Sequence, residues 1–412
     1  MDNVKHISVR SLLSEALLID SIVADKVDIQ KIRRDIHAHP ELSYDEQRTS
    51  QLVKEQLKAL GITVYSGFAK TGLVGVIKAG QSKRAIGLRA DMDALPIQEH
   101  NHFSHQSKYA GKMHACGHDG HTAMLLAAAR YLSKQQNFDG SVYFIFQPAE
   151  EEGAGAQSMI KDGLFEKFPM QAVFGMHNWP GLPVGQFAIS SGPVMASKNT
   201  FRIVIRGKGC HAALPHLGLD PVPVAAQIIL ALQTILTRNA NPLANGLISV
   251  TQVHAGSGAT NVISDSCELA GTVRTFSDDL LNLIEQRMYE IVQHTCLAYG
   301  MEAEFEFNKD YPATINHEQA VAISRRVMVN IVGEDQVIAQ SATMGAEDFA
   351  FMLQEVPGSY CFIGNGEGDH RNLGHGAGPC SLHNASYDFN DDILPLGATY
   401  WVRLVEAYLA AE

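Results

Sequence analysis

The first 198 residues switch repeatedly between a helical spacing of apolar positions and short, nearly continuous apolar runs. The helical spacing predicts helices over residues 27–59, with a break at His39 and Pro40, and over residues 122–134 and 156–162. The apolar runs predict strands over residues 73–77, 85–89, 141–146 and 172–175, the first two in a glycine-rich hairpin pattern. Strands that alternate with helices predict an α/β layer.

Residues 199–309 follow a different order. The pattern predicts strands over residues 201–206, 247–254, 267–275 and 302–307, and helices over residues 222–238 and 277–299. Ser277 suits the cap of the second helix because its hydroxyl can accept hydrogen bonds from the free amides of the first turn. The order βαββαβ predicts a ferredoxin-like α+β domain. We therefore expect an α/β domain, residues 1–198 and 310–412, with this α+β domain inserted at residues 199–309.

Composition narrows the class of protein. The chain has 412 residues, more than one core usually holds, and its net charge is −12. A chain this acidic is a poor candidate for binding nucleic acid or anionic membranes. No apolar run approaches ~18 residues, and residues 1–28 lack the flanks of a signal peptide, so neither a membrane span nor export is predicted. The six cysteines are then expected to be reduced thiols in the cytoplasm.

Metal-binding side chains concentrate in the loop His114-Ala115-Cys116-Gly117-His118-Asp119-Gly120-His121, just before the predicted helix at residues 122–134. A soft thiolate at Cys116 and an imidazole at His118 can both face one cation from a loop loosened by Gly117. Three later segments add donors, residues 147–152, residues 175–179 and residues 381–384. Together they provide sulfur, nitrogen and oxygen donors in the numbers that a two-metal hydrolytic site needs.

Asp93, Glu150 and His177 each come just after a predicted strand, and chemistry collects at the carboxyl ends of strands in α/β sheets. Glu150 and Glu151 cannot face one point from an extended strand, because successive side chains alternate. At a strand end that turns, one carboxylate can bind metal while the other exchanges a proton. A solvated acidic loop is the alternative, and Glu152 is assigned to it.

Each candidate also has a structural interpretation. Cys116 alone could be a buried thiol, and His177 and His383 alone could be core histidines. Asp93 is expected to orient a ligand rather than bind metal, and its alternative is a turn cap. The remaining polar groups are expected to organise loops: Asp91, His114, Asp119, His121, His37 and His39.

Six ordered segments carry a resemblance to a known family: residues 89–96 (Arg-Ala-Asp-Met-Asp-Ala-Leu-Pro), 113–121, 147–151, 175–180, 211–216, and His383 with residues 387–391. The chain resembles the aminoacylase and carboxypeptidase G class of metallohydrolases. Within it, the chain is similar to hippurate hydrolases, N-acyl-amino-acid amidohydrolases and indole-acetyl-amino-acid hydrolases. The resemblance implies a zinc-peptidase-like catalytic α/β domain, an inserted lid or dimerisation domain, and a homodimer formed through that insert.

The resemblance also implies a site and an activity. Two divalent metal ions would be bound by Cys116, His118, Glu151, His177 and His383. The activity would be cleavage of N-acyl amino acids, with hippurate-like or short-chain acyl groups, by a metal-bridged water that Glu150 activates. His211 would steady the oxyanion. Asn261 and Arg274 are candidates for substrate contacts, because a guanidinium fits a free carboxylate. Zinc suits the mixed donors best, and manganese, cobalt and nickel are compatible.

Other functions stay open at this point. The same site could belong to a dipeptidase or to a deacetylase of an N-acetylated biosynthetic intermediate. Cys116 could act as a nucleophile in a thiol amidase. A metal-binding protein without catalysis would be expected to lack Glu150, which is present. A zinc deaminase needs a His-x-Glu motif, whereas this loop reads His114-Ala115-Cys116.

Overall fold

The computed structural model describes residues 13, 16–371 and 374–410. The chain divides into two compact units, each with its own core. Unit 1 comprises Met1–Gly192, Ile315–Ser341 and Asp348–Glu412, and unit 2 comprises Pro193–Thr314 and Ala342–Glu347. The prediction of no signal peptide concerns residues that lie partly outside the described ones. The domain limits at 198/199 and 309/310 stay predictions.

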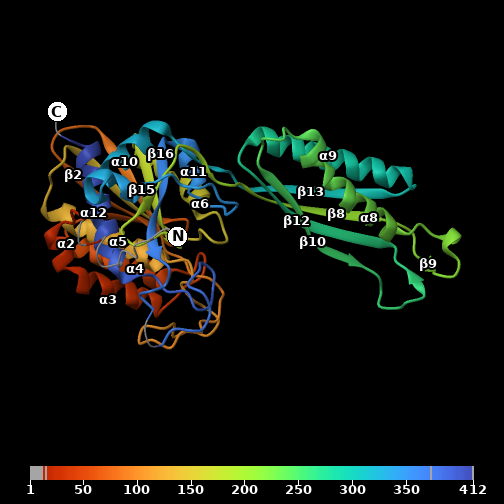
Figure 1. The fold of residues 1–412 in the computed structure, drawn as a ribbon, viewed down its shortest axis with the longest axis horizontal. Helices are drawn as coiled ribbons and strands as arrows, with labels where there is room; N and C mark the ends of the chain where they lie inside the picture. The colour runs from red at the N-terminus through yellow and green to blue at the C-terminus, as the bar shows by residue number, and fades with distance from the viewer. Residues whose placement is uncertain (1–12, 14–15, 372–373, 411–412) are drawn as a thin grey trace, which may run out of the picture. The chain divides into compact units, whose positions relative to one another are not determined.

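Unit 1 is a sheet covered by helices (Figure 1). Its helices are α2 (Asp20–Ala24), α3 (Lys26–His37), α4 (Gln47–Ala59), α5 (His118–Lys134), α6 (Gly155–Lys161), α7 (Leu164–Lys167), α10 (Glu318–Val332), α11 (Ala350–Glu355) and α12 (Leu394–Tyr408). Its strands are β1 (Thr63–Phe68), β2 (Gly72–Ala79), β3 (Ala85–Asp91), β4 (Gly140–Gln147), β5 (Ala172–Pro180), β6 (Phe187–Ala188), β15 (Val337–Ile338) and β16 (Gly358–Gly366). Short 3-10 turns lie at η3 (Glu334–Gln336) and η4 (Asp391–Ile393).

These eight strands form one mixed sheet in the order β1-β2-β4-β3-β5-β16-β6-β15. β4, β3, β5 and β16 run parallel, so their carboxyl ends lie at the same edge. The predicted hairpin of the first two strands was wrong. β2 pairs antiparallel with β1, a strand that the sequence pattern missed, and β4 lies between β2 and β3.

The middle of the sheet is buried on both faces. Every residue of β3 is buried, and so is every residue of β16. Helices α5 and α12 pack against each other and against β3 (Figure 1). Thirteen of the side chains of α5 are buried, starting at His118 itself. The first turn of α5 therefore enters the interior at the carboxyl edge of the sheet, where a polar site can be shielded from water.

Unit 2 has the predicted order βαββαβ. Its main elements are β8 (Lys198–Arg206), α8 (Pro221–Leu232), β10 (Gly246–Ala255), β12 (Ser266–Thr275), α9 (Asp278–Ala298) and β13 (Glu302–Tyr311). The shorter ones are β9 (Cys210–His211), η1 (Pro215–Leu217), η2 (Ile235–Asn239) and β11 (Val262–Ile263). Two further strands lie where the chain passes between units, β7 (Gly192–Met195) and β14 (Thr314–Asn316).

The strand order β10-β12-β8-β13, antiparallel throughout, is that of a ferredoxin-like sheet. Ser277 caps α9, since its side chain accepts a hydrogen bond from the amide of Leu280. The helix predicted over residues 222–238 is instead α8 followed by the π-helical turn η2. A separate apolar core, which includes Ile203, Ile228 and Ile284, lies within this unit.

Candidate metal centre

A tight turn at Gly117 presents Cys116 and His118 side by side. Gly117 precedes α5 with a φ of 96°, in the left-handed region that favours glycine. A Cβ atom there would lie 2.2 Å from Oδ1 of Asn178 and 2.6 Å from the Tyr387 hydroxyl. Only a residue without a side chain fits this turn, and the flanking cysteine and histidine are both buried.

A second turn, after β4, presents the two glutamates. Ala149 has a φ of 55°, so the chain leaves the strand abruptly before Glu150. The buried Glu46 carboxylate accepts a hydrogen bond from the amide of Ala149 at 2.9 Å and one from the Thr71 hydroxyl at 2.6 Å. Glu150 is buried, and Glu151 is half-buried. Glu150 and Glu151 do not face opposite sides, as they would in an extended strand, because the chain turns here. Both carboxylates lie near His118.

All five predicted ligands come together in unit 1. The Sγ of Cys116 lies 3.3 Å from Nε2 of His177. The Oε1 of Glu151 lies 3.3 Å from Nε2 of His383 and 3.9 Å from Nε2 of His118. Three groups of donor atoms lie within 4.8 Å of one another: Cys116 with His118 and His177, Cys116 with Glu151 and His383, and His118 with Glu150 and Glu151. Cys116, His118, Glu151, His177 and His383 would together hold bound cations.

The electrostatics of the group fit bound cations. Two buried atoms, Nε2 of His118 and Oε1 of Glu151, have no hydrogen-bond partner among the described residues. Although burial lowers it, the Asp91 and Asp93 carboxylates raise the pKa of His118 to about 10. Burial, and then the charge of Glu151, holds the pKa of the Cys116 thiol well above its ordinary value. A divalent cation would take the place of the protons on His118 and Cys116. Its positive charge would balance the neighbouring carboxylates and the buried thiolate.

Hydrogen bonds aim the two buried imidazoles. Nδ1 of His177 lies 2.6 Å from the carbonyl oxygen of Asn178, and Nδ1 of His118 lies 2.9 Å from the carbonyl oxygen of Asp93. A carbonyl oxygen only accepts, so the proton lies on Nδ1 in both rings. Each Nε2 therefore faces the other donor atoms, and a bound cation would take the place of the second proton that His118 carries at neutral pH.

Asp93 contacts three groups, the His118 ring, the Glu151 amide and the Ser43 hydroxyl, as expected of a residue that orients ligands. Its carboxylate lies 3.2 Å from Nδ1 of His118 and accepts hydrogen bonds from the amide of Glu151 at 3.0 Å and from the Ser43 hydroxyl at 2.9 Å. Although burial raises it, the hydrogen bond and charge of His118 lower the pKa of Asp93.

Asp91 has its oxygens engaged elsewhere. Arg89 donates to Oδ2 at 2.7 Å, and His121 Nδ1 lies 2.6 Å from Oδ1. Nε2 of His121 lies 3.0 Å from the amide nitrogen of Asn178 and 2.8 Å from its side-chain Oδ1. Asp91 and His121 also lie within 4.8 Å of a His118 donor atom. Because Arg89 already balances the negative charge of Asp91, we assign Asp91 and His121 to the organisation of the loop and not to the metal ligands.

Sequence reasoning missed a buried cluster behind the glutamate turn. The Asp348 carboxylate accepts hydrogen bonds from Gln147 at 2.8 and 2.9 Å, from Arg89 at 3.1 Å and from the amide of Ala156 at 2.9 Å. The amide of Asp348 donates to Oε1 of Glu150 at 3.4 Å. One signal was available: Arg89 is a charged residue that follows the apolar run Ala85–Leu88 in a strand that continues to Asp91.

One local prediction needs correction. His177 was expected after the end of a strand over residues 172–175, but it lies within β5, which continues to Pro180. The strand is longer because β16 pairs with it as far as Pro180. His177 still faces the donor group, since alternate residues of a strand face the same side.

The three candidates in unit 2 are described within that unit alone. His211 and Val262 are paired residues of the short β9–β11 ladder, and the carbonyl of Asn261 accepts from the amide of Ala212 at 2.9 Å. The amide of Ala213 donates to Nδ1 of His211 at 3.0 Å, so the ring carries its proton on Nε2. Arg274 lies on β12, and burial lowers its pKa.

Comparisons with known proteins agree with this site. The model of Peptidase family M20/M25/M40 matches residues 87–407. The chain is 40% identical to a hippurate hydrolase of Campylobacter jejuni, covering 95% of this chain and 99% of the relative. It is 42% identical to an N-acetyl-L-cysteine deacetylase of Bacillus subtilis, covering 82% and 80%. A crystal structure of a Bacillus subtilis dinuclear metal binding peptidase from the M20 family has a TM-score of 0.81 and 33% identity, covering 94% and 99%. In the described part of the chain, no helix is both long and apolar enough for a transmembrane span.

Proposed function

The chain belongs to Peptidase family M20/M25/M40, and on that premise we propose that it is a two-metal amidohydrolase that cleaves N-acyl amino acids to a carboxylic acid and a free amino acid. The convergence of Cys116, His118, Glu151, His177 and His383 in overlapping donor groups carries the proposal. Cys116, His118 and His177 are buried, Glu151 is half-buried, and the side chain of His383 is 52% exposed. Zinc is the cation that we expect, because thiolate, imidazole and carboxylate ligands suit it.

Bound metal ions of this kind polarise an amide carbonyl and lower the pKa of a water molecule. The residues of the chain then supply proton transfer. Glu150 is buried beside the ligands, in a donor group with His118 and Glu151, and its Oε1 accepts a hydrogen bond from the amide of Asp348 at 3.4 Å. Its carboxylate can accept a proton from water and deliver it to the leaving nitrogen, as a general base and then a general acid.

Unit 2 would supply the contacts to substrate. His211 is exposed and has its proton on Nε2, so it can donate a hydrogen bond to the developing oxyanion. Arg274 is positively charged, and its guanidinium can bond the free carboxylate of the amino acid at two points. Asn261 adds an amide just before the strand β11 that pairs with His211. A homodimer formed through unit 2 is part of the proposal.

The alternative of a cysteine nucleophile is disfavoured by the site. A nucleophilic thiol needs a lowered pKa, whereas burial and the neighbouring Glu151 and Glu150 raise that of Cys116.

The six cysteines are free, which supports a reducing compartment such as the cytoplasm. Hippurate-like and short-chain acyl substrates are the specific proposal, in line with the names of the two relatives.

The decisive experiment is amine release from N-benzoyl, N-acetyl and dipeptide substrates after chelation and after adding back zinc, manganese, cobalt or nickel. Activity should vanish with the chelator and return with metal. Glu150→Gln should keep its metal and lose 100-fold or more in kcat, on the order of what a general base contributes. Activity that survives complete metal removal, or a fully active Glu150→Gln protein, would overturn the proposal. A clear preference for dipeptides would replace the N-acyl substrate class.

A further inference from the structure

Arg33 is a fully buried cation that joins two segments of unit 1. It lies on α3, and its side chain is 0% exposed. Its Nε lies 3.0 Å from Oδ2 of Asp119, and its Nη2 donates to Oδ1 of Asp388 at 2.5 Å. Both partners are themselves buried, with side chains 0% and 7% exposed. One guanidinium therefore joins Asp119 to Asp388, which is far away in the sequence. Its Nη1 also lies 3.6 Å from Oδ1 of Asp391 and 3.0 Å from Nε2 of His105.

Each of these carboxylates lies close in the sequence to a proposed metal ligand. Asp119 follows His118 in the first turn of α5. Asp388 ends the short segment that begins at His383, where the His383 amide donates to the carbonyl of Ala115 at 2.8 Å. The backbone at His383 has a φ of 60°, so this segment does not take its shape from ordinary strand or helix geometry. Contacts at its two ends must hold it.

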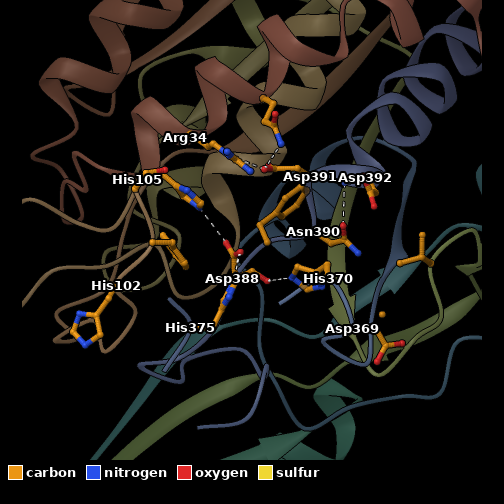
Figure 2. Close-up of a pocket in the computed structure, with 16 residues that line it drawn as sticks. Arg34, His102, His105, Asp369, His370, His375, Asp388, Asn390, Asp391 and Asp392 are labelled. Atoms are coloured by element: carbon orange, nitrogen blue, oxygen red, sulfur yellow. Dashed lines mark hydrogen bonds and ion pairs between the residues drawn. The ribbon is translucent and has the colours of Figure 1, made fainter. Parts of the chain in front are cut away.

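The far end of the segment has several polar neighbours. In Figure 2, Asp388 lies among histidines at a cavity of about 710 Å³, with His375 Nε2 3.0 Å from Oδ2 and His105 Nε2 3.7 Å from Oδ1. Tyr387 accepts hydrogen bonds at its hydroxyl from Asn178 at 2.6 Å and at its carbonyl from Asn101 at 2.9 Å. Arg33 joins the segment to the first turn of α5 through Asp388 and Asp119, and next to Asp388 the ring of Phe389 lies against Gly120 of the same turn.

We propose that Arg33 is a positioning residue of the metal centre, holding His383 at a fixed distance from His118 through Asp388 and Asp119. This inference rests on the proposed function. The donor group of Cys116, Glu151 and His383 contains the ligand that this segment carries, whereas the group of Cys116, His118 and His177 does not. Loss of Arg33 should therefore weaken one cation site selectively. A lysine keeps the charge, but all its N–H donors are on one nitrogen, so it lacks the planar fork with which a guanidinium reaches two carboxylates.

Cobalt(II) titration of chelated protein tests this without using turnover. In Arg33→Lys the affinity for the second cobalt should fall about 10–100-fold, the range for residues that orient ligands. The first cobalt should bind within about threefold of its original affinity and keep a thiolate charge-transfer band from Cys116. Arg48→Lys is the matched control, because Arg48 also lies in unit 1 and pairs at 2.7 Å with Asp35, a carboxylate outside the Arg33 ion pairs. It should bind both cobalt ions as the original protein does.

If Arg33→Lys does not fold, Asp388→Asn replaces it and should give the same selective loss. Unchanged second-site affinity in the folded variant overturns the positioning role, and so does an equal loss at both sites, which marks general loosening. A chelated original protein that binds fewer than two cobalt ions overturns the proposed two-metal function itself, and this inference with it. Elevated cobalt should restore amidase activity to Arg33→Lys, a rescue that lost fold would not allow.

Discussion

His37 gives a stability prediction with a defined sign. The ring is buried in α3, with Nδ1 2.9 Å from Oδ2 of Asp119 and Nε2 3.2 Å from Oε1 of Glu99. Although burial lowers it, the hydrogen bonds of Asp119 and Glu99 raise the pKa of His37 to about 9, above the ordinary value of 6.5. At neutral pH the ring is a buried cation between two carboxylates. Replacing it with glutamine removes the charge and keeps a hydrogen-bonding side chain.

The protonated ring stabilises the folded state below about pH 6.5, and that contribution is lost as the pH rises through about 9. The sign follows because the folded state binds the proton more tightly than the unfolded state. One pKa unit corresponds to about 1.4 kcal/mol, so the difference between 6.5 and 9 is worth on the order of 3 kcal/mol.

Tryptophan fluorescence can measure this in one unit only, because both tryptophans, Trp179 and Trp401, belong to unit 1. Denaturant unfolding of the chelated original protein and of His37→Gln is compared at about pH 6 and about pH 9.5. The original protein should be more stable than His37→Gln at about pH 6, and this stability difference should be about 3 kcal/mol larger than at about pH 9.5. Packing lost in the variant is the same at both pH values and cancels. Parallel pH dependences would show that His37 is not a buried cation.

Three further outcomes are expected. Cys116→Ser should weaken both cation sites in a cobalt titration, unlike Arg33→Lys, because Cys116 belongs to both donor groups; unchanged stoichiometry and affinity would remove it as a ligand. Asp93→Asn should lower metal affinity about 10–100-fold by equilibrium dialysis, since it loses the charge that faces His118; a smaller change would leave it a turn cap. Gly117→Ala should lower the free energy of unfolding about 1–3 kcal/mol more than Gly111→Ala, which shares a positive φ but meets nothing within 4 Å; equal losses would contradict the close contact with Asn178.

The sequence predicted what local pattern encodes. The sequence predicted a donor-rich loop at Cys116 before a helix over residues 122–134, whereas α5 begins at His118, so this ligand lies on the helix itself. The order of elements in unit 2 followed from the apolar pattern and from the capping residue Ser277. The family and the hydrolase class followed from the motifs. The five ligands lie together in the structure, as the motifs implied.

Long-range pairing could not be predicted in the same way. Arg33 and Asp388 are 355 positions apart, and Arg89 and Asp348 are 259 apart. No local period relates such residues, because the fold alone brings them together. The length of β5 and the position of β4 between β2 and β3 depended on strand pairing, which short apolar runs do not specify. A charged residue directly after an apolar run of the same strand was the one local sign that a distant partner existed.

The order of strands has a consequence for synthesis of the chain. β16 lies between β5 and β6, yet it is made 178 residues after the end of β5, counting from Pro180 to Gly358. At typical translation rates of about 5–20 residues per second, the edge of β5 waits roughly 10–40 s for its partner. Unit 2 is nearly complete by then and can fold first, whereas the nascent sheet of unit 1 keeps an open edge. Ribosome-associated chaperones therefore have a defined window in which to protect this protein from aggregation.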